Sequence, residues 1–262
     1  MNNVSELVLN YLQQYNCQIL DDYKTVLRQA CDIHPPPHGK AWYGNSYRQF
    51  ARNAEWFANS LITNATEEGT GSKEVWQFSQ QIENQEFAQL VRNHSIDESR
   101  HSLMFVALLN IIFPTKIETD FRTQLQALSP QYYHHKHPPI IPISSAQVMD
   151  ENLVMDEIIQ INLLEIRALI LQLLLRPVLQ AYAAPENLAK VTRMSDILIY
   201  DETKHIEYSG YCIGKYMEPR HQSWVREMMI YRQKTVNEMF LSDVELDRSV
   251  GTTVLKTQER RN

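Results

Sequence analysis

Two copies of one five-residue motif constrain this chain more than any other feature of its sequence. Asp-Glu-Ser-Arg-His occupies residues 97–101, and Asp-Glu-Thr-Lys-His occupies residues 201–205. Each copy places an acid and an imidazole three residues apart in a segment rich in helix-forming residues. Residues i and i+3 share a face of a helix, so Glu98 and His101 can reach the same point in space. The second copy can do the same.

The composition favours an all-α chain. Only 7 of the 262 residues are glycine, 44% are hydrophobic, and no long run alternates apolar and polar residues as a half-buried strand would. The length is sufficient to bury a sizeable core. We therefore expect a single helical domain spanning residues 1–262.

Charge and cysteine content narrow the functional class. The net charge of −6 argues against a nucleic-acid-binding surface, which is normally basic. The three cysteines, without framework spacing, are typical of a reducing cytoplasm. The first residues do not resemble a signal peptide, and polar residues interrupt the most apolar stretch, 158–175. The expectation is a cytoplasmic protein that binds neither nucleic acid nor membrane.

Helical periodicity predicts a succession of helices joined by short loops. Their approximate ranges are 3–32, 46–63, 73–113 with room for one break, 118–128, 146–182, 186–217 and 221–240. Residues 46–218 form the expected core bundle, with additional helices on both sides of it. The polar residues 243–262 are expected to be a loose tail, and the glycine- and serine-containing stretch 67–72 is expected to be a loop.

Two proline-containing segments carry histidines. His34 and His38 flank three prolines, and residues 129–144 contain three more histidines before a proline pair. Prolines prevent a helical arrangement of ligands. The first segment is therefore predicted to be a solvated loop, and the second a crossover loop or lid between two helical hairpins.

Glu165 stands in the apolar run 163–170. A carboxylate there is costly to bury unless it is paired or coordinated, and Arg167 points to another side of the helix. A hairpin turning near residues 183–185 would place Glu165 opposite Glu202. Two Glu-x-x-His pairs, each with a partner Glu on a neighbouring helix, are the ligands of a dinuclear metal centre in a four-helix bundle. Such carboxylate-rich sites suit iron or manganese better than zinc.

The two motifs, in the forms Asp-Glu-Ser-Arg-His-Ser-Leu-Met-Phe and Asp-Glu-Thr-Lys-His-Ile-Glu-Tyr, resemble the ligand helices of ferritin-like di-iron oxygenases and oxidases. The first is most similar to the p-aminobenzoate N-oxygenase branch. The resemblance extends over residues 46–218 as a pattern of helices and is sharp only over the motifs. It implies a ferritin-like four-helix bundle in which two irons use dioxygen to oxidise a small organic substrate, N-oxygenation included. It also implies an external electron donor; manganese in place of one or both irons, and a homodimer, are left open.

The resemblance, carried over residue by residue, implies a set of metal ligands. They are Glu55, Glu98, His101, Glu165, Glu202 and His205, with Glu55 chosen because it lies in the helix before the first motif. The N-oxygenase branch has an extra histidine one turn before the Glu of its last motif, where this chain has Leu198. His94 instead lies one turn before Glu98. It is either a seventh ligand or a neighbour that does not bind metal.

Two alternatives remain. Haem-oxygenase-like di-iron oxidases use Glu-x-x-His, then Glu, then Asp-x-x-x-His, and this chain satisfies that order with Asp201 as a ligand and without Glu55. A non-catalytic iron-binding or storage bundle is the other alternative. In the preferred interpretation Asp97 and Asp201 are candidates to accept the second ring N–H of a metal-bound histidine. Several tyrosines near the second motif, Tyr208 among them, are interpreted as core packing.

Overall fold

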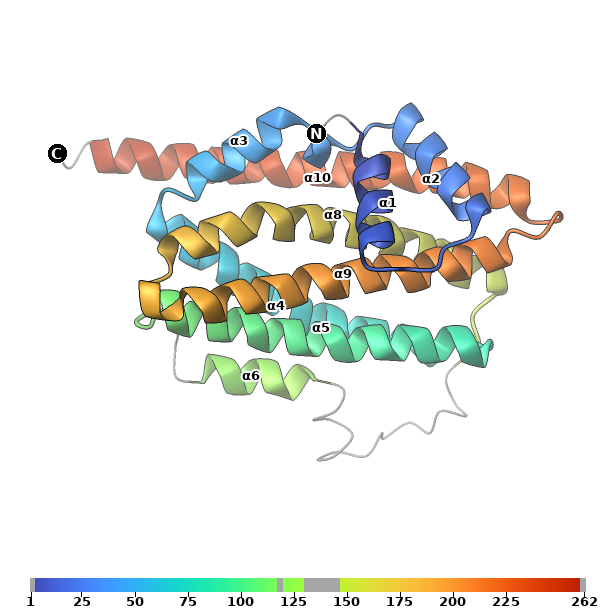
Figure 1. The fold of residues 1–262 in the computed structure, drawn as a ribbon, viewed down its shortest axis with the longest axis horizontal. Helices are drawn as coiled ribbons and strands as arrows, with labels where there is room; N and C mark the ends of the chain where they lie inside the picture. Colours follow the sequence, from blue (N-terminus) through green and yellow to red (C-terminus); the bar gives the residue numbers. More distant parts are fainter. Residues whose placement is uncertain (1–2, 117–119, 130–146, 260–262) are drawn as a thin grey trace.

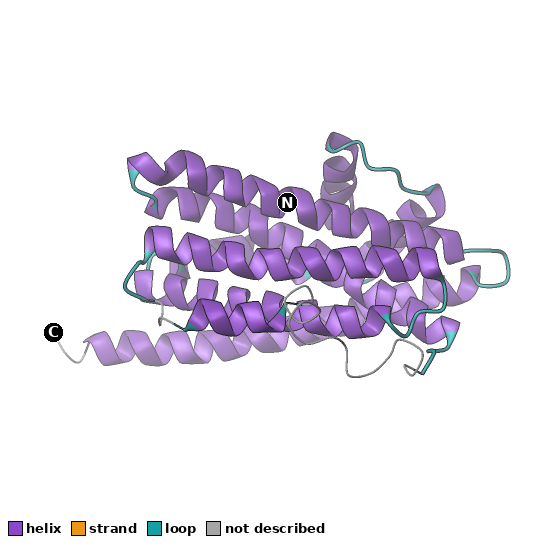
Figure 2. Cartoon of the chain, turned by 90° about the horizontal axis from the view of Figure 1, so that it is seen from below, coloured by secondary structure: helices purple, strands orange, loops and turns teal. Residues whose placement is uncertain are grey.

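The computed structural model describes residues 3–116, 120–129 and 147–259, and describes side chains as far as residue 242. Within these residues all regular structure is helical, as predicted, and no strand is present (Figure 2). The α-helices are α1 (Val4–Gln14), α2 (Asp21–Ile33), α3 (Ala41–Phe50), α4 (Ala54–Ser79), α5 (Gln85–Ile112), α6 (Phe121–Leu128), α8 (Glu151–Tyr182), α9 (Leu188–Tyr216) and α10 (Gln222–Glu259). Short 3-10 segments, η1 (Pro37–Gly39) and η3 (Pro185–Asn187), precede α3 and α9.

Four long helices form the centre of the molecule. Helices α4 and α5 pack along their lengths as one hairpin, and α8 and α9 as a second (Figure 1). Only residues 80–84 and 183–187 connect the partners, so each pair runs antiparallel. Helix α5 also packs against α9, which joins the two hairpins.

Side-chain caps explain where the long helices begin. The side chain of Asn53 accepts hydrogen bonds from the first backbone N–H groups of α4, and Asn84 does the same for α5. Asp150 caps α8 through the N–H of Asn152. Such caps satisfy donors that a helix start leaves free. The cap at Asn84 produces the single break for which the sequence left room between residues 73 and 113.

The stretch 67–72, predicted to be a loop, is part of α4. The small residues of this stretch allow α5 to approach α4 closely and do not form a turn. A Cβ on Gly69 would lie 3.1 Å from the Oγ of Ser102 on α5, and the carbonyl of Ser72 accepts a 2.6 Å hydrogen bond from Ser95. Close approach of α4 and α5 therefore decides the local structure, and α4 is longer than its composition indicates.

The outer helices lie on two sides of the hairpins. Helices α1, α2, α3 and α10 lie on the side of α8 and α9, and α6 packs on the side of α4 and α5 (Figure 1). The expected first helix is divided at Asn16, whose φ of 55° interrupts helical geometry. Residues 243–259, expected to be a loose tail, continue α10 to Glu259. The predicted lid at 129–144 lies, apart from residue 129, outside the described residues.

Helix α8 is the most apolar helix of the bundle. By length and composition alone it could cross a membrane, since an 18-residue window has a mean hydropathy of 1.8. Of that window, 56% is buried inside the molecule, as in a core helix. Two apolar clusters surround it. On α5 one cluster includes Val91 and the other includes Phe105, and polar residues lie between them.

Candidate metal centre

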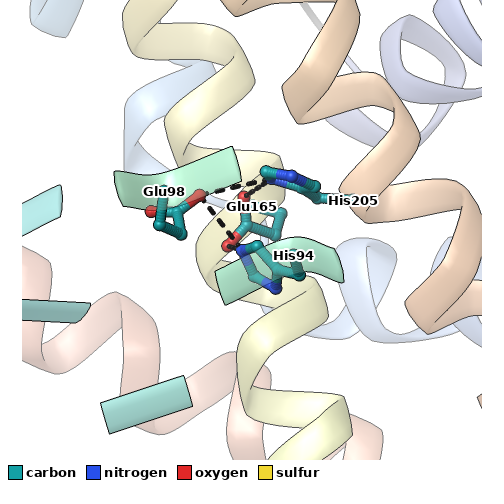
Figure 3. Close-up of side chains that lie close together, drawn as sticks. All are labelled: His94, Glu98, Glu165 and His205. Atoms are coloured by element: carbon teal, nitrogen blue, oxygen red, sulfur yellow. Dashed lines mark hydrogen bonds and ion pairs between the residues drawn. The ribbon is translucent and has the colours of Figure 1, made fainter. Parts of the chain in front are cut away.

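Seven acidic and imidazole side chains meet in the polar region between the two apolar clusters. They form two groups, each with ligand atoms within 4.8 Å of one another. The first group is His94, Glu98, Glu165 and His205 (Figure 3), and the second is Glu68, His101 and Glu202. Each of the four central helices contributes at least one residue. The sequence motifs thus converge on one place, as predicted.

Helical spacing explains how each chain segment delivers its ligands. On α5, His94, Glu98 and His101 are separated by four and three residues, which is the spacing of one helical face. On α9, Glu202 and His205 repeat the Glu-x-x-His part of this pattern. On this face His94 and His101 are buried, with His101 0% exposed, and Glu98 is partly buried.

In the first group two imidazoles face two carboxylates. The Nε2 atom of His94 lies 3.1 Å from Glu98 Oε1 and 3.4 Å from Glu165 Oε1. The Nδ1 atom of His205 lies 3.4 Å from Glu98 Oε1 and 3.3 Å from Glu165 Oε2. Figure 3 shows the four side chains pointing toward a common space. The imidazole rings of His94 and His205 lie close, with centroids 3.9 Å apart.

In the second group one imidazole faces three carboxylates. The Nδ1 atom of His101 lies 3.7 Å from Glu68 Oε2, 3.5 Å from Glu98 Oε1 and 3.8 Å from Glu202 Oε1. The other oxygen of Glu202 lies 3.6 Å from Nδ1 of His205. Glu98 and Glu202 therefore contact imidazoles of both groups. Carboxylates in this position can bridge two metal ions.

These residues fit a dinuclear metal centre. His101 Nδ1 is fully buried and has no hydrogen-bond partner in the described structure, although three carboxylates surround it. A buried nitrogen without a partner is costly, and a cation between it and the carboxylates would remove that cost. Four carboxylates and three imidazoles also match the oxygen-rich donor set that iron and manganese accept.

The aspartate of each motif lies beside the histidine of the other motif, across the bundle. Asp201 Oδ2 lies 3.1 Å from Nε2 of His101, and Asp97 Oδ2 lies 3.6 Å from Nε2 of His205. Arg100 lies 2.8 Å from both aspartates. A carboxylate on the outer nitrogen orients a metal-binding imidazole. Asp201 therefore has the geometry predicted for such a partner. Asp97 lies beyond hydrogen-bond distance, and Nε2 of His205 has no hydrogen-bond partner in the described structure.

His94 has a different partner. Its Nδ1 atom lies 2.6 Å from the hydroxyl of Tyr208, which is buried on α9. Its Nε2 atom faces Glu98 and Glu165, so the ring belongs to the group that contains His205 rather than the one that contains His101. The structure thus places His94 among the residues that could hold a metal ion, and its role as a seventh ligand stays a prediction.

Burial and mutual charge shift the pKa values of the cluster in opposite directions. Burial raises the pKa of Glu202 to about 7. Burial opposes ionisation of Glu165 too, but His94 and His205 lower its pKa to about 2. Burial alone would lower the pKa of His101, yet the surrounding carboxylates hold it well above its ordinary value. The cluster therefore shares protons that an incoming cation would displace.

The structure does not bring the sixth predicted ligand, Glu55, together with the other six. Glu55 lies exposed in the first turn of α4, beside the Asn53 cap, and belongs to neither group. Glu68, three turns or more further along α4, is the carboxylate that faces His101. Glu68 continues the apolar stripe of Leu61 and Ala65 at helical spacing. That spacing could have identified it, had residues 67–72 not been predicted to be a loop.

Two other sequence predictions are resolved differently. Asp201, required as a ligand by the haem-oxygenase-like alternative, lies outside both groups and contacts Nε2 of His101, while Glu202 lies inside. His38, expected in a solvated loop, is 4% exposed, and neither ring nitrogen has a hydrogen-bond partner in the described structure. His38 is not part of either group.

Comparison with known proteins adds no assignment. No protein-family model, no curated protein and no solved structure matches the chain. The centre is accordingly defined by its own residues and geometry.

Proposed function

We propose that this protein is a ferritin-like, non-haem di-iron oxidase or oxygenase that uses dioxygen to oxidise a small organic substrate. The observation that carries the proposal is the convergence of two Glu-x-x-His pairs, from α5 and α9, on one buried point. Glu68 of α4 and Glu165 of α8 complete the arrangement. Ligands projecting inward from four helices are the pattern of ferritin-like dinuclear carboxylate proteins.

The donor set favours iron, or manganese in one or both positions. Zinc sites usually contain fewer carboxylates and more imidazole or thiolate, and none of the three cysteines belongs to either group. One half of the centre would be held by Glu68 and His101. The other would be held by Glu165, His205 and His94, with Glu98 and Glu202 shared between the halves.

Bound iron would supply the redox chemistry and the site at which dioxygen reacts. The chain's own residues position the ligands and exclude bulk water. Asp201 orients His101 through a hydrogen bond to its Nε2, and Asp97 lies near Nε2 of His205. Apolar residues of both clusters lie before and after the ligands on α5, so the centre is shielded from solvent. Burial raises the pKa of Glu202 to about 7, so its ionisation near neutral pH is incomplete and metal entry would favour the carboxylate form.

The electron donor, the cellular location, the reaction and the oligomeric state are further parts of what we propose. An oxidase of this class needs an external electron donor to reduce the metals again, and we propose a cytoplasmic location in which such donors occur. N-oxygenation is the reaction suggested by the sequence resemblance to the p-aminobenzoate N-oxygenase branch. A homodimer is compatible with the proposal.

A non-catalytic iron-binding bundle is the second candidate, because the same ligands would hold iron without turnover. The haem-oxygenase-like alternative has less support, because Asp201 pairs with His101 and Arg100 instead of joining either group.

Metal loading followed by oxygen exposure tests the proposal. The purified protein is loaded anaerobically with Fe(II), the bound metal is quantified, and absorbance is followed after mixing with oxygenated buffer. We expect two irons per chain and an absorbance transient that forms and decays. Less than one metal per chain, unchanged in Glu98→Ala and Glu202→Ala, would rule out the centre. Two irons that oxidise without a transient and accumulate as ferric mineral would identify a storage protein.

A further inference from the structure

The three histidines of the centre have two kinds of partner on their outer nitrogens. The outer nitrogen of His101 is hydrogen-bonded to a carboxylate, Asp201 at 3.1 Å, and that of His205 faces a carboxylate beyond hydrogen-bond distance, Asp97 at 3.6 Å. The outer nitrogen of His94 faces a phenol instead, the hydroxyl of Tyr208 at 2.6 Å. An ionised carboxylate can only accept a hydrogen bond, whereas a hydroxyl can either donate or accept. The two kinds of partner therefore impose different restrictions on the imidazole.

A carboxylate partner restricts a neutral imidazole to one tautomer. With Asp201 on Nε2, that nitrogen must carry the proton, and the lone pair of His101 is directed from Nδ1 into the centre. The hydroxyl of Tyr208 permits both tautomers of His94. When it accepts from Nδ1–H, the Nε2 lone pair faces the centre. When it donates to Nδ1, Nε2 carries the proton, and this N–H donates a hydrogen bond to Glu98 or Glu165, which lie at 3.1 and 3.4 Å.

The immediate surroundings hold Tyr208 in this role. Its ring lies one turn beyond His205 on α9 and packs against the rings of both His94 and His205, with centroids 5.4 and 6.4 Å apart. The residue is only 9% exposed, so solvent cannot readily replace it as the partner of Nδ1. In the described structure both ring nitrogens of His94 have a partner when the proton is on Nε2. When it is on Nδ1, the Nε2 lone pair faces two carboxylates, and a cation between them would be its partner.

We propose that Tyr208 is a positioning residue that makes His94 an exchangeable third imidazole of the centre. With Tyr208 accepting, His94 binds the metal that His205 and Glu165 hold. With Tyr208 donating, His94 withdraws to Glu98 or Glu165 and leaves a coordination position open. His101, hydrogen-bonded to Asp201, and His205, which has no hydroxyl partner on its outer nitrogen, stay bound in both states. This inference rests on the proposed metal centre, and its test distinguishes failure of the one from failure of the other.

The test uses the full chain loaded with Co(II), whose paramagnetism shifts the N–H proton signals of bound imidazoles out of the protein envelope. The wild type should take up two Co(II) ions and show three exchangeable shifted signals. His94→Gln should lose one of them and thereby assign it. Tyr208→Phe keeps the ring and removes the hydroxyl. It should lose the same signal and weaken binding of one of the two ions by about 10-fold, the scale of losing an outer partner.

Tyr216→Phe is the matched control. Tyr216 lies on the same helix, is 6% exposed and donates its hydroxyl proton to Asn152, away from the centre. All three signals and both affinities should be unchanged in this variant, which shows that loss of a buried hydroxyl on α9 is not itself the cause.

Exchangeability is tested by adding azide to the Co(II)-loaded wild type. We expect the His94 signal to disappear while the other two remain. Three signals that persist at saturating azide, or in Tyr208→Phe, would overturn the role of Tyr208 and leave the metal centre intact. Two signals in the wild type would show that His94 is not a ligand. Absence of Co(II) binding would overturn the centre itself.

Discussion

Glu68 and Glu55 are on the same helix, but only Glu68 lies close to a buried histidine. Glu68 lies 3.7 Å from the buried Nδ1 of His101, whereas Glu55 is exposed beside the helix cap. The substitution Glu68→Gln keeps the volume and removes the charge that would neutralise a metal ion. We expect it to weaken binding of one metal by more than about 100-fold, because losing only an outer partner costs 10- to 100-fold.

Glu55→Gln is the control for that substitution and should leave both metals bound. Inductively coupled plasma analysis after dialysis, together with titration of each variant, measures the two outcomes. Equal retention of metal in the two variants would contradict the assignment of Glu68.

His38 gives a prediction about pH, independent of the metal. Burial lowers its pKa to about 3, from 6.5 in the unfolded chain, so the folded state keeps the ring neutral while the unfolded state takes up a proton. Stability from this residue is therefore complete above pH 6.5 and is lost as the pH falls toward 3. At pH 5 the loss is about 2 kcal/mol.

The substitution His38→Leu removes the titrating group. The free energy of unfolding, measured with urea at pH 7.5 and pH 5, should fall less between these two values in the variant than in the wild type. The difference between the two proteins isolates His38 from other groups that titrate in this range. Parallel pH dependences would show that His38 is protonated in the folded protein.

The motifs were predictable at the level of residues because their helical periodicity is local. Glu98, His101, Glu202 and His205 were found from spacing alone, and Glu165 from its apolar surroundings. Glu68 was not found, because Gly69 and its neighbours resemble a turn and only the packing of α4 against α5 makes them helical. His94 was located by spacing, but its assignment to the half that contains His205 needed the geometry of the bundle.

At the scale of elements, two glycines within helices differ in how closely another helix packs against them, while both have the low helix propensity of glycine. A Cβ on Gly210 of α9 would lie 2.8 Å from the ring of Tyr23, which is fully buried and hydrogen-bonded to Asn162. A Cβ on Gly71 of α4 would meet nothing within 4 Å. Alanine is favoured over glycine by up to about 1 kcal/mol inside a helix, so the two positions should respond in opposite directions.

We expect Gly210→Ala to destabilise the protein by about 1–3 kcal/mol, the usual cost of overpacking, and Gly71→Ala to stabilise it slightly. Urea unfolding of both variants measures the difference. Stabilisation by both substitutions would mean that α2 and α9 can separate without cost.

The order of the central helices and the extent of α8 and α9 were predictable, because their apolar periodicity extends over many turns, whereas the extents of α4 and α5 were not. The expected helices at 146–182 and 186–217 correspond to α8 and α9. The boundaries between α1 and α2, and between α3 and α4, were not predicted. They depend on a positive φ at Asn16 and on the cap at Asn53, which are single residues within otherwise helical stretches.

For the whole molecule, metal binding should increase stability. The interior holds four carboxylates and three imidazoles that repel or share protons without a cation. At free Fe(II) or Mn(II) 100-fold above the dissociation constant, each site adds about 2.7 kcal/mol. For a chain of this length two occupied sites should raise the unfolding temperature by about 10–20 °C.

Thermal unfolding monitored by circular dichroism, with and without a chelator, measures this shift under anaerobic conditions. The double variant His101→Gln with His205→Gln should show no shift, while its apo form remains folded. A shift that persists in the double variant would place the stabilising metal elsewhere.

The division of the ligands between the two hairpins has a consequence for how the protein matures. The hairpin α4–α5 supplies four of the seven ligands and α8–α9 supplies three, and neither group is complete within one hairpin. Contacts within a hairpin are local and form faster than contacts between hairpins. A newly made chain can thus acquire its helices without metal, but the proposed centre is not complete, and would not hold metal ions, until the hairpins dock. The rate of metal uptake therefore reports the last step of assembly.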